Sequence, residues 1–168
     1  AKYFNKNCQI VLCAGAPDTK EIAEETEALI ADLKKDRDGV ILISEMLPRE
    51  KIKVLYSHAR VFACPSLYEP FGIINLEAMA CRTAVVASSV GGIKEVVVDG
   101  VTGFLVPLEQ WHVAPFEPVN PDVFSRDLAA AINKVLDNPE LAESMAAAGQ
   151  QRAREVFSWS SIAQQTKK

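Results

Sequence analysis

Two glutamates, Glu69 and Glu77, lie inside the otherwise apolar segment SLYEPFGIINLEAMAC. Buried carboxylates are rare unless they are paired, so each of these side chains needs either a partner or an exposed position. One continuous helix would turn the two side chains roughly 80° apart. Pro70 and Gly72 oppose such a helix. We therefore predict that Glu69 belongs to a loop and Glu77 to the second turn of a helix starting near Gly72, with both carboxylates facing one cleft.

The start of this predicted helix could hold an anion. Gly72 lets the backbone approach a ligand closely, and the amides of Gly72, Ile73 and Ile74 are free to meet a phosphate. The two carboxylates only accept hydrogen bonds, which suits pairs of hydroxyl groups. A phosphate between two polyols is a sugar nucleotide. The residues alone also allow a simpler interpretation, in which Glu77 is an acid favoured by the helix dipole and Glu69 is an exposed loop acid.

The surrounding sequence alternates between short apolar runs and helical patterns. It predicts strands at 9–14, 40–43, 61–64, 84–88 and 103–106, and helices opening at 17–19, 48, 72, 91, 122, 139 and 158, with a surface loop after residue 107. Continuous apolar strands indicate a parallel sheet covered on both faces, which is a Rossmann-like, doubly wound α/β domain. Ligands of such sheets bind beyond the carboxyl ends of the strands, where SLYEPFG and SSVGG both lie.

The composition is that of a globular domain, with 168 residues, 49% hydrophobic and 24% charged. The net charge of −4 argues against a nucleic-acid partner, and no apolar run is long enough for an integral membrane segment. The four cysteines lack the spacing of a metal site, which favours reduced thiols and a cytoplasmic location. Residues 1–8 look like the tail of a helix, which suggests a fragment trimmed at its N-terminal side.

The segment EPFGIINLE resembles the E-x7-E motif of retaining GT-B glycosyltransferases, most closely glycosyltransferase family 4. The following LEAMACRTAVVASSVGGIKEVVVDGVTGFLVP continues the resemblance without a gap. The segments VLCAGAPDT and MLPREKI are similar to the branch of bacterial glycogen synthase and maltose-1-phosphate synthase. The resemblance extends from Gln9 to about Trp159 and implies the C-terminal half of a GT-B fold.

The resemblance also implies roles for individual residues. Glu69 would be the catalytic-site residue that holds the donor sugar, and Glu77 would hold the ribose. The base would lie against the turn around Met46 and Leu47. Further donor contacts are expected at Phe71, Gly72, Ile73, Ile74, Gly91 and Gly92, and the alternative for the last two is a simple helix-starting turn. The family needs no bound metal or cofactor, because amides, a helix dipole and basic side chains carry the leaving diphosphate.

For function, the resemblance implies a donor-binding domain at 1–157 and a helix at 158–168 that crosses to a missing N-terminal domain. That missing part would supply the acceptor site and the basic diphosphate clamp, so the isolated chain should be inactive. The parent enzyme would move glucose from ADP-glucose or UDP-glucose to an α-glucan or glucose 1-phosphate, in glycogen synthesis. Alternatives are a sucrose- or trehalose-type synthase, a cell-envelope mannosyltransferase, a GT-B epimerase, and a non-catalytic sugar-nucleotide module.

The sequence departs from the family pattern near the motif. Arg82-Thr83-Ala84 replaces the usual Gly-Thr-Pro, Ser89 replaces Asp, and Lys94 replaces Pro. These positions lie at a helix end and in a loop, so we expect tuning of the loop and not loss of the site. Arg82 could simply compensate the helix dipole. Asn75 is expected to face solvent or to cap locally.

Overall fold

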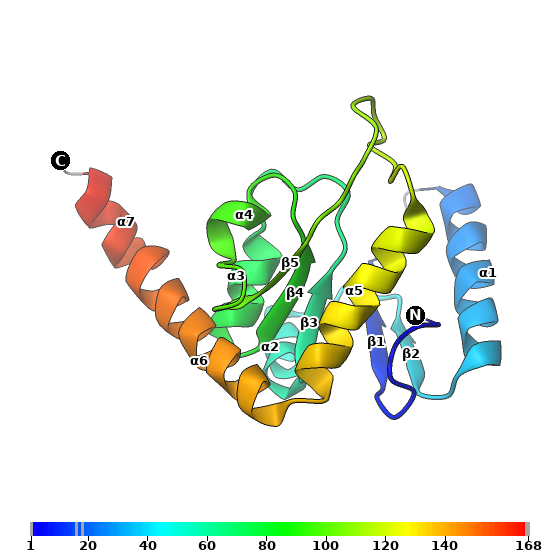
Figure 1. Ribbon diagram of the computed structural model, residues 1–168, viewed down its shortest axis with the longest axis horizontal. Coiled ribbons are helices and arrows are strands. Elements are labelled where there is room, and N and C mark those ends of the chain that lie inside the picture. The colour runs from blue at the N-terminus through cyan, green and yellow to red at the C-terminus, as the bar shows by residue number, and fades with distance from the viewer. Residues whose placement is uncertain (1, 16, 18, 167–168) are drawn as a thin grey trace.

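The computed structural model describes residues 2–15, 17 and 19–166 (Figure 1). Parallel strands and helices alternate along the chain, as predicted. The strands are β1 (Ile10–Cys13), β2 (Val40–Ile43), β3 (Val61–Cys64), β4 (Ala84–Ser88) and β5 (Gly103–Val106). The helices are α1 (Lys20–Asp36), α2 (Arg49–His58), α3 (Ile73–Ala80), α4 (Ile93–Val96), α5 (Pro121–Leu136), α6 (Pro139–Val156) and α7 (Trp159–Thr166). The α/β class with parallel strands is therefore confirmed, although Asp18 of the predicted first helix start lies outside the described residues.

The strands form two parallel sheets and not the single sheet expected. One sheet pairs β1 with β2, and the other has the order β3-β4-β5. In a doubly wound sheet of order 3-2-1-4-5-6, the first strand lies between the second and the fourth. β1 to β5 match the remaining five positions, and none of the described residues fills the central one. Among the described residues, β1 and β3 are therefore each an edge strand of their own sheet.

The three-stranded part has a core on both faces of its sheet. All five residues of β4 are at most 1% exposed. Val85 and Ala87 pack with residues of α3, α4 and α6 on one face, whereas Ala84 and Val86 pack with α5 and the start of α6 on the other. This two-sided burial explains why β4 reads as a continuous apolar run.

The N-terminal segment 2–8 forms turns, so the prediction of a helix tail there was wrong. Its polar groups instead dock on α5. The hydroxyl of Tyr3 donates to Asp122 (2.6 Å), and the Asn133 amide donates to the Tyr3 carbonyl (3.0 Å). Asn133 also accepts from the backbone amide of Asn5 (2.8 Å). The segment therefore ties the β1–β2 part to the helix that covers the three-stranded sheet.

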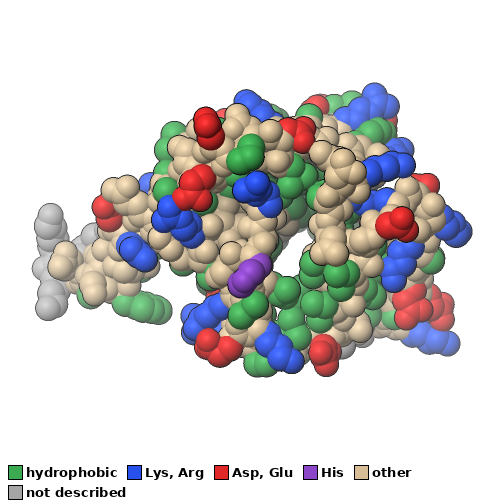
Figure 2. All heavy atoms as spheres, turned by 90° about the horizontal axis from the view of Figure 1, so that it is seen from below, with side chains coloured by type: hydrophobic (Ala, Val, Ile, Leu, Met, Phe, Trp, Pro, Cys, Tyr) green, Lys and Arg blue, Asp and Glu red, His purple; other side chains and the backbone are tan. Residues whose placement is uncertain are grey.

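The two-stranded part is less well covered. Seen from below, Figure 2 shows hydrophobic side chains gathered beside a hollow between the two parts of the molecule. Val11 of β1 is 44% exposed, Ile41 of β2 43% and Val54 of α2 57%. Apolar side chains in a parallel sheet are normally buried on both faces. Their exposure sets the two-stranded part apart from the three-stranded sheet, whose central strand is buried on both faces.

Candidate functional site

Glu69 lies in the loop after β3 and Glu77 lies in α3, as the sequence predicted, and a cleft that both carboxylates face stays a prediction. Gly72 is the N-cap of α3 and adopts a left-handed conformation (φ 90°, ψ 36°) that favours glycine. Glu69 precedes it in the loop, and Glu77 lies in the second turn of the helix. Both side chains are half-buried at the edge formed by the carboxyl ends of the strands. An L side chain at Gly72 would therefore strain the fold as well as any ligand contact.

The carboxylate of Glu69 already occupies part of the predicted anion site. Its Oε1 accepts a hydrogen bond from the Gly72 amide at 3.0 Å. The sequence predicted that the Gly72 amide is free to bind a phosphate. This was wrong, because the Glu69 carboxylate already accepts its hydrogen bond. The amides of Ile73 and Ile74, in contrast, have no acceptor in this part of the described chain. A bound phosphate would meet these two amides, while Glu69 keeps its second oxygen for hydroxyl groups.

The Gly91-Gly92 turn, which follows β4, packs directly on the backbone of the Glu69 loop. The Gly92 amide donates to the Glu69 carbonyl at 3.0 Å. A Cβ on Gly91 would lie 2.0 Å from that same oxygen, and one on Gly92 would lie 2.4 Å from the Pro70 carbonyl oxygen. The predicted close backbone approach exists, but its partner is this loop. The Gly92 amide is consequently not available to a ligand, and a donor contact at either glycine stays a prediction.

Glu77 lies near the phenol of Tyr56 on α2. Burial raises the pKa of Tyr56 to about 12, and the negative charge of Glu77 contributes in the same direction. Tyr56 packs edge-on against Phe62 of β3, with ring centroids 5.2 Å apart. Its carbonyl accepts from the Thr83 hydroxyl at 2.5 Å. These contacts fix α2 beside the helix that carries Glu77.

Asn75 contradicts its prediction, because it is fully buried beneath the helix start. Its Nδ2 lies 3.5 Å from the Cys64 sulfur, and its Oδ1 has no hydrogen-bond partner. Asn75 shares a helix face with Ala78 and Met79, which lie three and four residues further along and are also fully buried. That spacing was the signal by which the sequence could have revealed its burial.

The predicted surface loop after β5 is a hairpin that supports the same edge. The Trp111 amide donates to the Glu117 carbonyl (3.0 Å), and Figure 1 shows the hairpin rising beyond the strands. Gln110 links the hairpin to the loop after β3, because its amide donates to the carbonyl of Leu67 (2.9 Å). Sequence reasoning missed this link, since a long-range contact of one glutamine leaves no local pattern.

Two further aromatic contacts surround the Glu69 loop. The Tyr68 ring stacks on Phe116 of the hairpin with centroids 5.4 Å apart. Phe71, a predicted donor contact, is 42% exposed, and its ring meets Phe157 edge-on at 6.3 Å. The loop is thus held from the hairpin on one side and from the end of α6 on the other.

The predicted base site lies beside an apolar groove. An open groove of about 520 Å³ is lined by Ile43, Glu45, Leu47, Glu50, Lys51, Val54 and Leu55. Leu47 is part of this lining, whereas the Met46 side chain is 84% exposed and is not. Mostly apolar lining with a few polar groups is typical of ligand sites. A nucleobase contact here stays a prediction.

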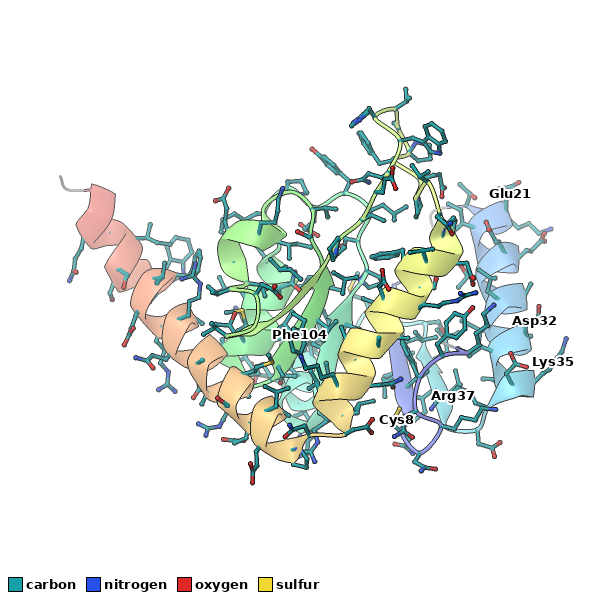
Figure 3. The ribbon with its side chains drawn as sticks, in the orientation of Figure 1. Cys8, Glu21, Asp32, Lys35, Arg37 and Phe104 are labelled. Atoms are coloured by element: carbon teal, nitrogen blue, oxygen red, sulfur yellow. The ribbon has the colours of Figure 1, made fainter. Side chains whose placement is uncertain are left out.

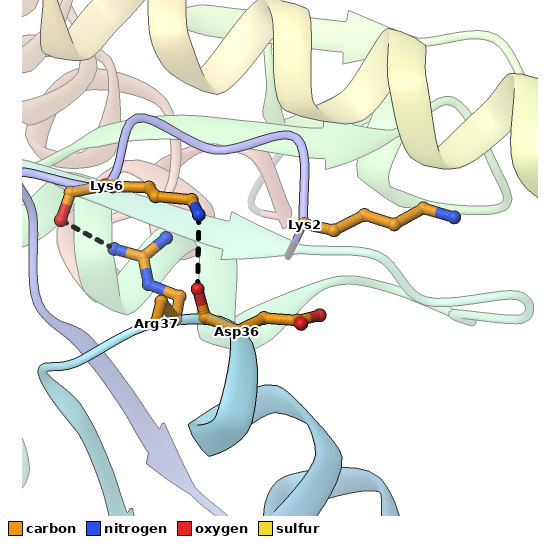
Figure 4. A pocket seen from close by; sticks show the side chains of 4 residues that line it. All are labelled: Lys2, Lys6, Asp36 and Arg37. Atoms are coloured by element: carbon orange, nitrogen blue, oxygen red, sulfur yellow. Dashed lines mark hydrogen bonds between the residues drawn. The ribbon is translucent and has the colours of Figure 1, made fainter.

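A second cavity lies away from all predicted site residues. It has a volume of about 220 Å³ and is lined by Lys2, Lys6, Asp36 and Arg37 (Figure 4). The Lys6 ammonium group donates to the Asp36 carbonyl at 3.2 Å. Figure 3 shows Arg37 near Cys8 at the lower end of the molecule, opposite the hairpin. The Arg37 guanidinium donates to backbone carbonyls of the N-terminal segment, so its observed role is to hold that segment.

Within the described part of the chain, no helix combines the length and apolar character needed to cross a membrane. Among the same residues, no three or more His, Cys, Asp or Glu side chains group closely enough to hold a metal ion.

Comparison with known proteins agrees with this fold. Residues 5–114 match the family model for glycosyl transferases group 1. The α-maltose-1-phosphate synthase of Mycolicibacterium smegmatis is 49% identical over 99% of this chain and 41% of its own length. The chain thus spans about two fifths of that relative.

Solved structures agree as well. Sucrose-phosphate synthase from Thermosynechococcus elongatus has a TM-score of 0.76 and 33% identity, over 95% of this chain and 37% of its own. Anabaena HepE in complex with UDP-glucose has a TM-score of 0.78 and 26% identity, over 98% of this chain and 41% of its own. The expected Rossmann-like glycosyltransferase fold is confirmed. The chain belongs to the glycosyl transferases group 1 family.

Proposed function

We propose that this chain is the donor-binding domain of a retaining glycosyltransferase. The whole protein would move glucose from ADP-glucose or UDP-glucose to an α-glucan or to glucose 1-phosphate, in cytoplasmic glycogen synthesis. The observation that carries the proposal is the helix start itself. Glu69 is held by the Gly72 amide at 3.0 Å, a second carboxylate follows at Glu77, and two neighbouring amides lack acceptors. This combination offers hydroxyl acceptors on both sides of a phosphate site.

In this arrangement the α3 amides and helix dipole would stabilise the diphosphate as it leaves. Glu77 would accept from the ribose hydroxyls and Glu69 from the hydroxyls of the transferred sugar. The acceptor would attack from the face that the nucleotide leaves, so no nucleophile of the enzyme, no metal and no cofactor is required. The acceptor site and basic diphosphate clamp would lie in the N-terminal domain, so we propose that the 168-residue chain alone binds donor without turnover.

The comparisons support the donor and acceptor classes. HepE was solved with UDP-glucose, which supports a nucleotide sugar as ligand. The α-maltose-1-phosphate synthase relative supports a glucosyl phosphate or glucan acceptor. The four cysteines are free thiols, which fits a reducing compartment.

A second candidate is a sucrose-type synthase, which the similarity to sucrose-phosphate synthase favours. A donor and acceptor screen on the full-length protein would separate the two candidates. Transfer to a fructose phosphate, in place of a glucan or glucose 1-phosphate, would select the sucrose-type synthase.

The proposed roles of the two glutamates can be tested by calorimetry on the chain described here. A hydrogen bond to a charged group contributes about 1.5–3 kcal/mol, so Glu77→Gln should weaken UDP and UDP-glucose alike by about tenfold or more. Glu69→Gln should leave UDP nearly unchanged and weaken only UDP-glucose. The ADP pair of ligands should be measured in parallel.

Glu140→Gln is the matched control, because it removes the same charge from an exposed acid in the first turn of α6. It should change neither affinity. If both site variants bind all ligands as the parent does, the carboxylates only stabilise the helix start, and the proposal fails.

A further inference from the structure

We propose that the Gly91-Gly92 turn is a positioning element for Glu69, which sets how the site discriminates a sugar nucleotide from a bare nucleoside diphosphate. The inference rests on the proposed function of Glu69. It adds Gly91 and Gly92, which act without touching the donor. They hold the Glu69 carboxylate in the position where it can bind the donor sugar.

Three separate elements hold the segment that carries Glu69. The Gly72 amide at the start of α3 binds its carboxylate (3.0 Å), and the Gly92 amide before α4 binds its carbonyl (3.0 Å). Gln110 of the hairpin holds the Leu67 carbonyl two residues earlier (2.9 Å). Of these, the Gly91-Gly92 turn is the one whose backbone packs against the backbone of the glutamate segment so closely that a Cβ would clash.

The fit between the turn and the loop leaves no room for a side chain. A Cβ at Gly91 would lie 2.0 Å from the Glu69 carbonyl oxygen and 3.0 Å from its carbon. Both atoms are backbone, so a rotamer change cannot relieve the clash. Either the turn or the Glu69 segment would have to move.

The turn is the less free of the two to move. Val90 and Ile93 on either side of it are 6% and 0% exposed, within the core between β4 and the helices. The Ser89 amide is paired with the Val106 carbonyl of β5 at 2.8 Å. Glu69, in contrast, lies in a half-buried loop that belongs to no helix or strand. A side chain at Gly91 should therefore displace Glu69.

The displacement should affect only part of the ligand. Glu77 lies within α3, and no hydrogen bond among the described residues joins it to the turn, so its proposed ribose contact should persist. Loss of the Glu69 position would remove the contact to the transferred sugar. The expected signature is therefore a changed ratio of two affinities, for UDP-glucose and for UDP. A purely structural role of the glycines would lower both together.

Gly91→Ala and Gly100→Ala form a matched pair for this test. Both glycines have left-handed backbones (φ 46° and 74°), so alanine is strained at either position. A Cβ at Gly100, however, has no other atom within 4 Å. We expect Gly91→Ala to weaken UDP-glucose by about tenfold and UDP by less than about threefold in calorimetry, with ADP-glucose and ADP as the alternative pair. Gly100→Ala should lower the melting temperature and leave the ratio of the affinities unchanged.

A measurement on the unsubstituted chain covers the case in which Gly91→Ala does not fold. In NMR titrations, UDP-glucose should shift the Gly92 amide resonance beyond the shift that UDP causes, with the Gly100 amide as internal reference. Identical shifts with both ligands, or an unchanged affinity ratio in Gly91→Ala, would overturn the inference. Failure of the chain to bind any sugar nucleotide would instead overturn the proposed function beneath it, so the two failures are distinguishable.

Discussion

Replacing Arg82 by glycine should stabilise this domain relative to replacing it by alanine, which is the reverse of the usual order. Arg82 follows the C-cap of α3 with φ 62°, in the left-handed region. Its amide donates to the Met79 carbonyl (3.0 Å), and the Thr83 amide donates to that of Ala78 (3.1 Å). This pair of bonds is the Schellman ending of a helix, in which glycine is the usual residue at the position that Arg82 occupies.

The magnitude follows from comparing the two substitutions. Both variants lose the ion pair and hydrogen bonds of Arg82 with Glu143, an exposed contact that contributes about 0–1 kcal/mol. Alanine keeps the left-handed strain, which costs about 1–2 kcal/mol, and glycine removes it. Glycine pays about 0.4–1 kcal/mol more in unfolded-state entropy. Arg82→Gly should therefore be more stable than Arg82→Ala by about 0.8 kcal/mol, the middle of the range of roughly 0–1.6 kcal/mol that the difference of these two terms spans.

Urea unfolding of both variants gives the comparison, provided that their slopes agree. Gln151, an exposed position inside α6, supplies the control, since alanine there should be more stable than glycine by about 1 kcal/mol. If alanine is favoured at residue 82 as strongly as at 151, the left-handed helix ending is not the cause, and the reasoning is refuted.

Two other predictions concern stability. Gly72→Val should lower the melting temperature as well as donor affinity, because Gly72 has φ 90° and a Cβ there would lie 3.2 Å from the Asn75 amide and 3.3 Å from Ile93; an unchanged melting temperature would contradict the left-handed geometry. Burial raises the pKa of Tyr56 from 10.0 to about 12. Between these pH values only the unfolded chain loses the phenol proton, so the free energy of unfolding should fall as the pH rises. Thermal unfolding of Tyr56→Phe should show a smaller loss over that alkaline range, and an equal loss would exclude this residue as its source.

Much of the fold could be predicted from the sequence because its signals are local. The runs at 40–43, 61–64 and 84–88 match β2, β3 and β4, since continuous β-favouring residues are needed where both faces are covered. Pro70 and Gly72 correctly separated Glu69 from the helix of Glu77. The split of the sheet could not be read in this way, because it depends on which strand neighbours are present and not on the strands themselves.

The details of the site depended on which group satisfies each polar atom. The Gly72 amide was expected to be free, but the Glu69 carboxylate occupies it. Gly92 was expected to approach a ligand, but its amide meets the Glu69 carbonyl. Asn75 was expected at the surface, but it faces Cys64 in the core. The residue types were informative about geometry, but the partners of Gly92 and Asn75 came from other elements, and the partner of Gly72 was a side chain three residues earlier.

The two sheets divide the proposed site in a physically meaningful way. Glu69, Glu77 and the Gly91-Gly92 turn all belong to the three-stranded part, whose central strand is buried on both faces. The apolar groove that includes Leu47 instead lies between the end of β2 and α2. The α2 wall of this groove packs on α3 and so belongs with the three-stranded part, whereas the β2 wall belongs to the two-stranded part. Sugar and ribose contacts would therefore depend on local geometry, whereas recognition of the base would depend on how the two parts are held together.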